Sequence, residues 1–341
     1  MNEPLWINEQ DVVNLLGLGE AITALQSGLL REAQGHARNM EKTHVAWGAN
    51  NLHAIGAVFT DLGLAATKTW AHTSGGAAPL LVLLDANNGS LRAVIEAFAL
   101  GQLRTGGISG VATDWLAAPG ADELAVIGTG KQAILQIAAV HAVRPLKRLR
   151  VFSPRAESRK RLIENVRAEF SFDATEATSV QQAVADAPMI TLVTRASEPF
   201  IDARMIARGA HVNAVGAITP EREEFAQDLF SRSTRVVVDS VPAVKALSKE
   251  FMTQFAAPAR DWSEVTSLAQ LVAKNQRRTQ HDDITLFKAM GMGLADLALG
   301  AEIYQRAVAM NQGRAFPHPQ RTKPRLHTAR MSAAGALETL Q

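Results

Sequence analysis

The feature that most constrains this 341-residue chain is a regular alternation of short apolar runs and helical segments between residues 120 and 240. Parallel strands that are covered on both faces are uninterrupted by polar residues. Five such runs are present: "ELAVIGTG", "RLRVFS", "PMITLVT", "HVNAVGA" and "RVVVDS". Segments with helical spacing lie between the first three of them. This alternation predicts right-handed crossovers and an α/β fold with a Rossmann-type, doubly wound parallel sheet, which we assign to residues 119–295.

The first 118 residues have a different pattern and predict a separate mixed α+β domain. Apolar runs at 53–73 and 79–97 are typical of strands joined by turns, and "DANNGS" in the second run is an Asn-Gly-type hairpin signal. Residues 282–310 have the apolar spacing of a helix that follows the sheet. We assign residues 1–118 with 296–325 to this domain and expect residues 326–341 to form a flexible tail.

Composition excludes several classes of site. The chain has no cysteine, so disulfides, thiolate nucleophiles and thiolate zinc sites are excluded, and we expect no metal. The first thirty residues suit an amphipathic helix, and no apolar run reaches the eighteen residues of a membrane span. A cytoplasmic protein without a membrane partner is expected.

The basic pI of 9.0 comes mainly from the end of the chain. From residue 311 onward, five basic residues face one acidic residue, so this segment carries about four of the positive charges and the remainder is slightly negative. Nucleic-acid binding requires basic residues interleaved with aromatic ones on a fold. No nucleic-acid partner is expected.

A glycine-rich turn after the first strand predicts a dinucleotide site. Gly128, Gly130 and Ala133 form a G-x-G-x-x-A pattern between a strand and a helix, where backbone N–H groups can approach a pyrophosphate. The alternative is a tight turn whose glycines serve packing alone. The predicted cofactor contacts at this turn and at later strand ends are Gly128, Thr129, Gly130, Lys131, Gln132, Ala133, Thr194, Val215 and Gly216.

The end of the second strand predicts which dinucleotide binds. NAD enzymes usually have Asp or Glu there for the ribose 2′-hydroxyl, whereas a 2′-phosphate requires hydroxyls and arginine. This chain has Ser153, followed by Arg155, Arg159 and Lys160. NADPH is therefore favoured, with NADH as the alternative; Arg159 and Lys160 could equally be a solvated helix face.

Several motifs in order between residues 30 and 308 resemble the ornithine cyclodeaminase/mu-crystallin family. They are "KTW", "LLDANNGSLRAVIEAFALGQLRTGGISGVATDWLA", "IGTGKQA", "TRASEP", "VNAVGA" and "ITLFKAMGMGLADLA". Within this family the pattern is most similar to the ketimine reductases that act on Δ1-pyrroline-2-carboxylate. The resemblance implies a homodimer in which the first domain and the last helix bind substrate and form the dimer.

The resemblance also implies the substrate site. Arg38, Lys68 and Arg104 match the family's ligands for the substrate carboxylate, and Arg104 with Thr105 also matches its cofactor contacts. Arginine binds a carboxylate through two parallel hydrogen bonds, and lysine adds a compact charge. Each of the three cations could instead lie on the surface.

His53 and Lys68 are the predicted catalytic residues. His53 lies where the cyclodeaminases have a catalytic glutamate, and a histidine can donate or accept a proton near neutral pH. The alternative is a structural histidine in a strand. We interpret His72 as structural.

Ile218 differs from the family pattern and indicates the reaction. Cyclodeaminases and related dehydrogenases have an aspartate here that engages the substrate's amino group, which isoleucine cannot do. A cyclic ketimine needs no such ligand, so we predict NAD(P)H-dependent reduction of Δ1-pyrroline-2-carboxylate to L-proline, with the piperideine homologue as a second substrate. The alternatives are an NAD-dependent cyclodeaminase or alanine-type dehydrogenase, and a non-catalytic NADPH-dependent binder of small ligands.

The acidic segment after Ile218 is predicted to be exposed. Thr219 and Pro220 resemble a helix cap and first position, so Glu221, Glu223 and Glu224 are expected in the first turn of a helix.

Overall fold

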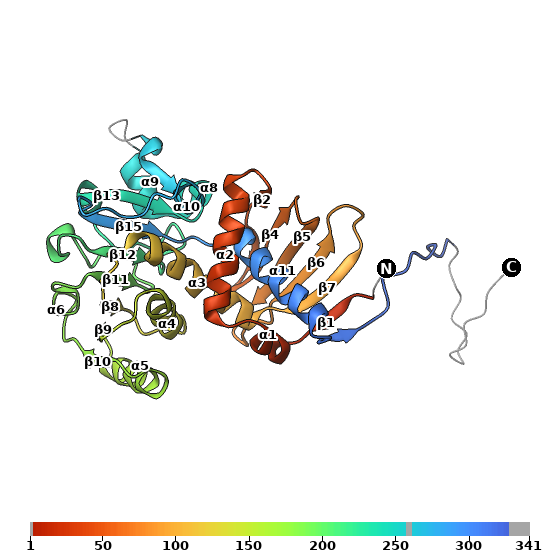
Figure 1. The fold of residues 1–341 in the computed structure, drawn as a ribbon, viewed down its shortest axis with the longest axis horizontal. Coiled ribbons are helices and arrows are strands. Elements are labelled where there is room, and N and C mark those ends of the chain that lie inside the picture. Colours follow the sequence, from red (N-terminus) through yellow and green to blue (C-terminus); the bar gives the residue numbers. More distant parts are fainter. Residues whose placement is uncertain (1–2, 257–260, 327–341) are drawn as a thin grey trace.

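A computed structural model describes residues 3–256 and 261–326, which form two lobes, each built on one sheet (Figure 1). The first sheet has the order β16-β1-β7-β6-β5-β4-β2, and β3 also pairs with β4. It is antiparallel except where β1 pairs with β7. Its strands are β1 (Leu5–Ile7), β2 (Ala37–Asn39), β3 (Thr43–Trp47), β4 (Asn50–Phe59), β5 (Leu64–His72), β6 (Leu80–Asp85), β7 (Leu91–Glu96) and β16 (Arg314–Ala315).

Helices cover one face of the first sheet. Helix α11 (Gly293–Ala309) crosses β4 and β5 and packs against α2 (Leu18–Ala33), while α1 (Glu9–Leu15) contacts α11 and β7 (Figure 1). A Cβ atom on Gly293 would lie 2.1 Å from the carbonyl oxygen of Gly56, so only glycine allows α11 to start this close to β4. The predicted β6–β7 hairpin is confirmed.

The second sheet is parallel throughout, in the order β10-β9-β8-β11-β12-β15-β13-β14. The chain reverses direction across the sheet between β8 and β11, and ligands of open α/β sheets bind at the carboxyl edge of such a point. The predicted Rossmann-type fold is confirmed. Its elements are α3 (Phe98–Leu116), β8 (Glu123–Ile127), α4 (Ala133–Val143), β9 (Arg148–Phe152), α5 (Ala156–Glu169), β10 (Asp173–Glu176), α6 (Val180–Val184), β11 (Met189–Leu192), β12 (His211–Ala214), α7 (Leu229–Arg232), β13 (Ser233–Val238), α8 (Val241–Leu247), α9 (Lys249–Phe255), β14 (Val265–Ser267), α10 (Leu268–Ala273) and β15 (Ile284–Lys288), with short 3-10 turns at Ala203–Met205 and Trp262–Glu264.

The prediction of one helix over residues 282–310 is wrong in its first part. Residues 284–288 form β15, a fully buried strand between β12 and β13, and α11 starts only at Gly293. Gly291 has a φ of +85° and separates the two elements. A short apolar run suits a buried strand and a buried helix equally, and the neighbouring strands decide between them. β10 and β14 were not predicted either.

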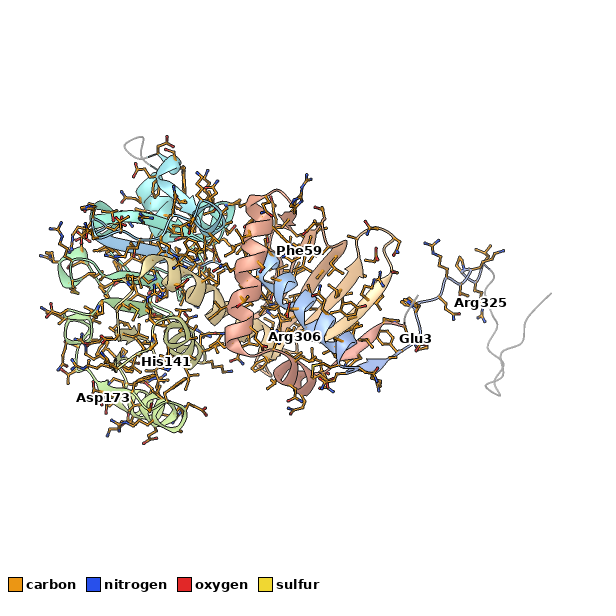
Figure 2. All side chains as sticks on the ribbon, viewed as in Figure 1. Glu3, Phe59, His141, Asp173, Arg306 and Arg325 are labelled. Atoms are coloured by element: carbon orange, nitrogen blue, oxygen red, sulfur yellow. The ribbon has the colours of Figure 1, made fainter. Side chains whose placement is uncertain are left out.

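The basic segment near the end of the chain leaves the body. Residues 317–326 have no regular secondary structure, and Arg325 lies on a stretch that extends away from both lobes (Figure 2). Most of the predicted tail, residues 327–341, lies outside the described residues.

No single helix in residues 3–256 and 261–326 is long and apolar enough to cross a membrane. The bent pair α1 and α2 passes the same test on length and composition together. The same described residues contain no group of three or more His, Asp or Glu side chains that could hold a metal ion.

Candidate active site

A cavity of about 1100 Å³ extends along the carboxyl edge of the second sheet and reaches the first sheet. The second sheet contributes the turns that follow β8, β9, β11, β12, β13 and β15, and the first sheet contributes side chains from β4 and β5. Predicted residues on its wall are Arg104, Thr105, Gly128, Thr129, Gly130, Lys131, Gln132, Ser153, Arg155, Thr194, Val215, Gly216 and Ile218. The sequence did not single out Lys42, Ile55, Trp70, Arg195, Arg222, Asp239, Met290 or Met292, which also line it.

The glycine-rich turn after β8 has the shape that a pyrophosphate requires. Gly128 has a φ of +116°, and a Cβ atom there would lie 2.5 Å from the carbonyl oxygen of Val193, so this position requires glycine. A Cβ atom on Gly130 would meet nothing within 4 Å, so the backbone is open to the cavity. Ala133 is buried at the start of α4 and packs instead of lining the wall. The turn therefore fits a dinucleotide.

Ser153 and Arg155 face the cavity at the end of β9, but Arg159 does not line it. The Arg159 guanidinium is held by Glu176, with Nε 3.0 Å from a carboxylate oxygen, and it donates a 2.6 Å hydrogen bond to the carbonyl oxygen of Ser153. Arg155 is exposed and forms no ion pair with another described residue. Of these two arginines, only Arg155 lies on the cavity wall.

Arg104 and Lys42 line the other end of the cavity. The predicted Lys68 lies buried beside Arg104 together with Asp296, and neither Lys68 nor Asp296 is on the wall itself. The Lys68 ammonium binds the carboxylate of Asp296 on α11, and Arg104 Nε lies 3.7 Å from Asp296 Oδ1. Arg104 Nε and Asp296 Oδ2 are buried and have no hydrogen-bond partner. Lys42 lines the cavity nearby. The unpartnered Arg104 Nε is a donor that a small anion in the cavity could satisfy.

Burial shifts the protonation of these groups. Burial lowers the pKa of Lys68, and the charge of Asp296 opposes this shift. Burial and then the charge of Arg104 lower the pKa of Lys42. Burial raises the pKa of Asp239, whose carboxylate accepts hydrogen bonds from the Met290 and Gly291 amides. Perturbed groups that converge in a cavity are typical of functional sites.

The structure does not bring Arg38 to this end of the cavity. Arg38 pairs with Val58, whereas Lys68 pairs with Ile55, and side chains of residues 55 and 58 point to opposite faces of β4. Arg38 is exposed and absent from the cavity wall, and Lys42 occupies the expected place. The motif "GHARNMEK" contains both cations, and only the strand register distinguishes them.

His53 lies behind the cavity wall. Its ring stacks on Trp70 with a centroid distance of 4.8 Å and on His44 at 5.7 Å, and its Nδ1 atom is buried without a partner. Burial lowers the pKa of His53. Trp70 and His72 line the cavity directly.

The predicted helix after Ile218 is absent. Residues 219–221 form a bend and a turn, residues 222 and 223 have no regular structure, and Glu224, expected on the surface, has no exposed area. Its carboxylate accepts four hydrogen bonds from Thr194, Gly216 and Ala217, which explains why a charged side chain is buried here. Acidic composition alone gives no signal for such a role.

A sequence profile described as the ornithine cyclodeaminase/mu-crystallin family matches residues 7–311. The chain belongs to this family. The predicted resemblance is thereby confirmed, and the cavity described above lies within the matched region.

Family members with curated names are similar over most of their length. A Δ1-pyrroline-2-carboxylate reductase of Bacillus cereus is 30% identical over 236 residues, which are 69% of this chain and 72% of the relative. The ketimine reductase mu-crystallin of Mus musculus is 31% identical over 224 residues, 66% of this chain and 68% of the relative. An alanine dehydrogenase of Archaeoglobus fulgidus is 24% identical over 328 residues, 91% and 97% of the two chains. Because all three names describe oxidoreductases, this is the enzyme class that the relatives support.

Solved structures share the fold. The Thermococcus litoralis Δ1-pyrroline-2-carboxylate reductase, in complex with NADH and L-proline, superimposes with a TM-score of 0.84 at 24% identity and covers 92% of this chain and 100% of its own. An archaeal alanine dehydrogenase dimer with bound NAD has a TM-score of 0.84 at 22% identity and covers 92% and 99%.

Proposed function

We propose that this protein reduces a cyclic ketimine that carries a 2-carboxylate, with NADPH as the preferred cofactor and NADH as a weaker one. The proposed reactions convert Δ1-pyrroline-2-carboxylate to L-proline and Δ1-piperideine-2-carboxylate to L-pipecolate. The observation that carries this proposal is the pairing of an anion-binding group, Lys42 and Arg104, with an apolar wall that includes Ile218, in the same cavity as the glycine-rich turn.

The roles of the chain's own residues follow from their contacts. The planar Arg104 guanidinium would bind the substrate carboxylate through two hydrogen bonds, and Lys42 would add a second positive charge. When bound, the reduced nicotinamide supplies a hydride for the imine carbon. The ring nitrogen also needs a proton. We propose that it comes from the Lys68 ammonium, which Asp296 holds in place and which lies 5.1 Å from the centre of the Trp70 ring on the cavity wall. Trp70, with His53 stacked behind it, would cover the ring and exclude water.

The apolar residue at 218 favours imine reduction over oxidation of a charged amine. Ile218 cannot accept a proton or pair with an ammonium, so a diamine substrate would lack a partner at this position. For a small hydrocarbon ring the same side chain is favourable, since each buried methylene contributes about 0.8 kcal/mol.

An assay of purified protein with a panel of cyclic imino acids tests the proposal. The five- and six-membered cyclic imines with a 2-carboxylate, formed in solution, should oxidise NADPH, which is followed as a loss of absorbance at 340 nm. The products should be L-proline and L-pipecolate. Ornithine and alanine with NAD serve as the opposing substrates. Ammonia release from either one, without imine reduction, would assign the protein to the cyclodeaminases or to the alanine-type dehydrogenases. Cofactor binding without turnover of any substrate would leave only a ligand-binding role.

We predict that Ser153→Asp reverses the cofactor preference. A carboxylate at the end of β9 would repel a 2′-phosphate and accept the ribose hydroxyl of NADH, so the ratio of kcat/KM for NADPH to that for NADH should fall at least tenfold. Arg155→Ala should lower the NADPH value alone, and Arg159→Ala, whose guanidinium is held by Glu176, is the matched control. An unchanged ratio in Ser153→Asp would contradict the assignment of NADPH.

We also propose that residues 1–118 with 296–325 act as one substrate-binding unit, with α3 at its boundary to the second lobe, and that two copies associate through this unit. The strands β3 and β4 expose Val45, Trp47 and Leu52 by 65%, 45% and 46%. Neighbouring exposed apolar side chains of this size mark interaction surfaces. Light scattering of the full chain should give twice the monomer mass, and a monomer at micromolar concentration would contradict this proposal.

A further inference from the structure

Glu224 connects two strand ends of the second sheet without reaching the cavity. One carboxylate oxygen accepts hydrogen bonds from the backbone amide and the hydroxyl of Thr194, at 2.7 and 2.8 Å. The other accepts from the amides of Gly216 and Ala217, at 2.9 and 3.1 Å. Thr194 follows β11 and Gly216 follows β12, so a single side chain fixes the spacing of two adjacent loops.

The two loops are too close together to tolerate a change in this arrangement. A Cβ atom on Gly216 would lie 2.3 Å from the Thr194 amide nitrogen and 2.4 Å from the Glu224 carboxylate. The three backbone amides need an acceptor because buried donors without one are costly. A carboxylate accepts hydrogen bonds on both of its oxygens. A glutamine has one acceptor oxygen and an NH₂ group that donates, so it cannot satisfy both sets of donors.

The backbone of Glu224 is held by a second buried hydrogen-bond network. The Glu224 amide donates a 3.1 Å hydrogen bond to Glu250, which also binds the ammonium of Lys288 at 3.1 Å and the hydroxyl of Ser248 at 2.7 Å. All four residues are fully buried. Lys288 ends β15, so the network fastens the carboxyl ends of β11, β12 and β15 together.

These ends lie on one side of the point where the chain reverses across the sheet. Thr194, Val215 and Gly216 line the cavity there, whereas Ser153 and Arg155 line it beyond β8, at the end of β9. A dinucleotide bound across such a point has one half on each side. The adenosine half belongs with Ser153 and Arg155, so the nicotinamide half belongs with the loops that Glu224 holds.

We propose that Glu224 is a positioning residue for the nicotinamide half of the cofactor, which it serves by fixing the spacing of Thr194 and Gly216. This inference rests on the proposed function, because it takes the dinucleotide as the ligand of this cavity. Glu224 itself touches neither substrate nor cofactor. Its replacement should therefore weaken binding of the nicotinamide half alone. A general loss of stability would weaken binding of both halves.

Binding measurements with two nucleotides test the inference. Glu224→Gln should weaken NADPH binding roughly ten- to a hundredfold, as expected for the loss of one or two charge-assisted hydrogen bonds. Binding of 2′-phospho-ADP-ribose, which lacks the nicotinamide, should stay within about twofold of the wild type. Titration calorimetry gives both dissociation constants, and NADH with ADP-ribose repeats the comparison.

Glu223→Gln is the matched control, because it removes the same charge from the same loop and breaks only an ion pair with the partly exposed Lys249. If Glu224→Gln does not fold, Glu224→Asp, which keeps the charge but has a shorter side chain, is used instead. It should also weaken NADPH binding more than binding of 2′-phospho-ADP-ribose, with a smaller difference between the two. Equal losses for both nucleotides, or no loss for either, would overturn the inference. If the contrast appears in a protein that reduces no imine, the proposed reaction fails and the role of Glu224 remains.

Discussion

Replacing Arg104 with alanine is expected to lower kcat/KM for Δ1-pyrroline-2-carboxylate by about a hundred- to ten-thousandfold. Two hydrogen bonds from a charged donor contribute about 1.5 to 3 kcal/mol each, and about 1.36 kcal/mol corresponds to a tenfold change in rate. The loss should be larger than for a surface arginine, because the Arg104 side chain is only 20% exposed and its Nε atom has no hydrogen-bond partner. Steady-state kinetics at saturating NADPH measure it.

Two further variants separate the geometry of the Arg104 side chain from its charge. Arg104→Lys keeps the charge but loses the planar fork, so it should recover only part of the lost kcat/KM. Arg277→Ala removes an arginine that binds Asp114 and lies over the Trp115 ring, away from the cavity, and should leave kcat/KM unchanged. Kinetics of Arg104→Ala equal to those of the wild type would remove Arg104 from the proposed site.

The sequence predicted those features of the fold that depend on local pattern. Alternating apolar runs and a glycine-rich turn specify their own conformations, so the parallel sheet, the β6–β7 hairpin and the turn at Gly128 followed from short stretches. β15 was not predicted in this way, because its five buried residues are followed closely by an apolar helix and the local pattern does not separate the two. Only its two neighbouring strands define it.

The composition of the substrate end of the cavity depends on contacts between distant segments. Lys42 lies near Arg104 and Arg38 does not. This difference follows from the register of the three-residue strand β2. Asp296 lies 228 positions from Lys68 in the chain. Glu224 belongs to an acidic cluster that is typical of a surface, and its burial depends on donors from two other loops. No local pattern encodes these three relations.

Asp296 provides the second large expected effect, since its charge opposes the effect of burial on the pKa of Lys68. Lys68 has a side chain that is 4% exposed, and its pKa is lowered by burial and raised by Asp296. Asp296→Asn removes the opposing charge and keeps the shape. The Lys68 pKa should therefore fall further, and a neutral Lys68 cannot supply the proton that the proposed reaction takes from its ammonium form.

The variant should consequently lose activity in a pH-dependent way. The alkaline limb of the kcat/KM profile should move to lower pH in Asp296→Asn. At pH values above the Lys68 pKa of both proteins, the loss should reach about a hundredfold if the pKa falls by two units, since each unit corresponds to a factor of ten. Profiles from pH 6 to 10 for variant and wild type measure the shift. Lys68→Met, which has no titratable group, should be inactive across this range.

Thermal unfolding gives an independent check on the same group. If the folded pKa of Lys68 falls below its unfolded value of about 10.4, the unfolded chain binds more protons between those two values, so stability rises with pH in that interval. The melting temperature of Asp296→Asn, relative to the wild type, should therefore increase as the pH is raised from 7 to 10. Asp114→Asn is the matched control, because Asp114 pairs with Arg144 and Arg277, which stay charged throughout this range. An Asp296→Asn protein with the pH profile and the relative melting temperatures of that control would show that Asp296 does not set the charge of Lys68.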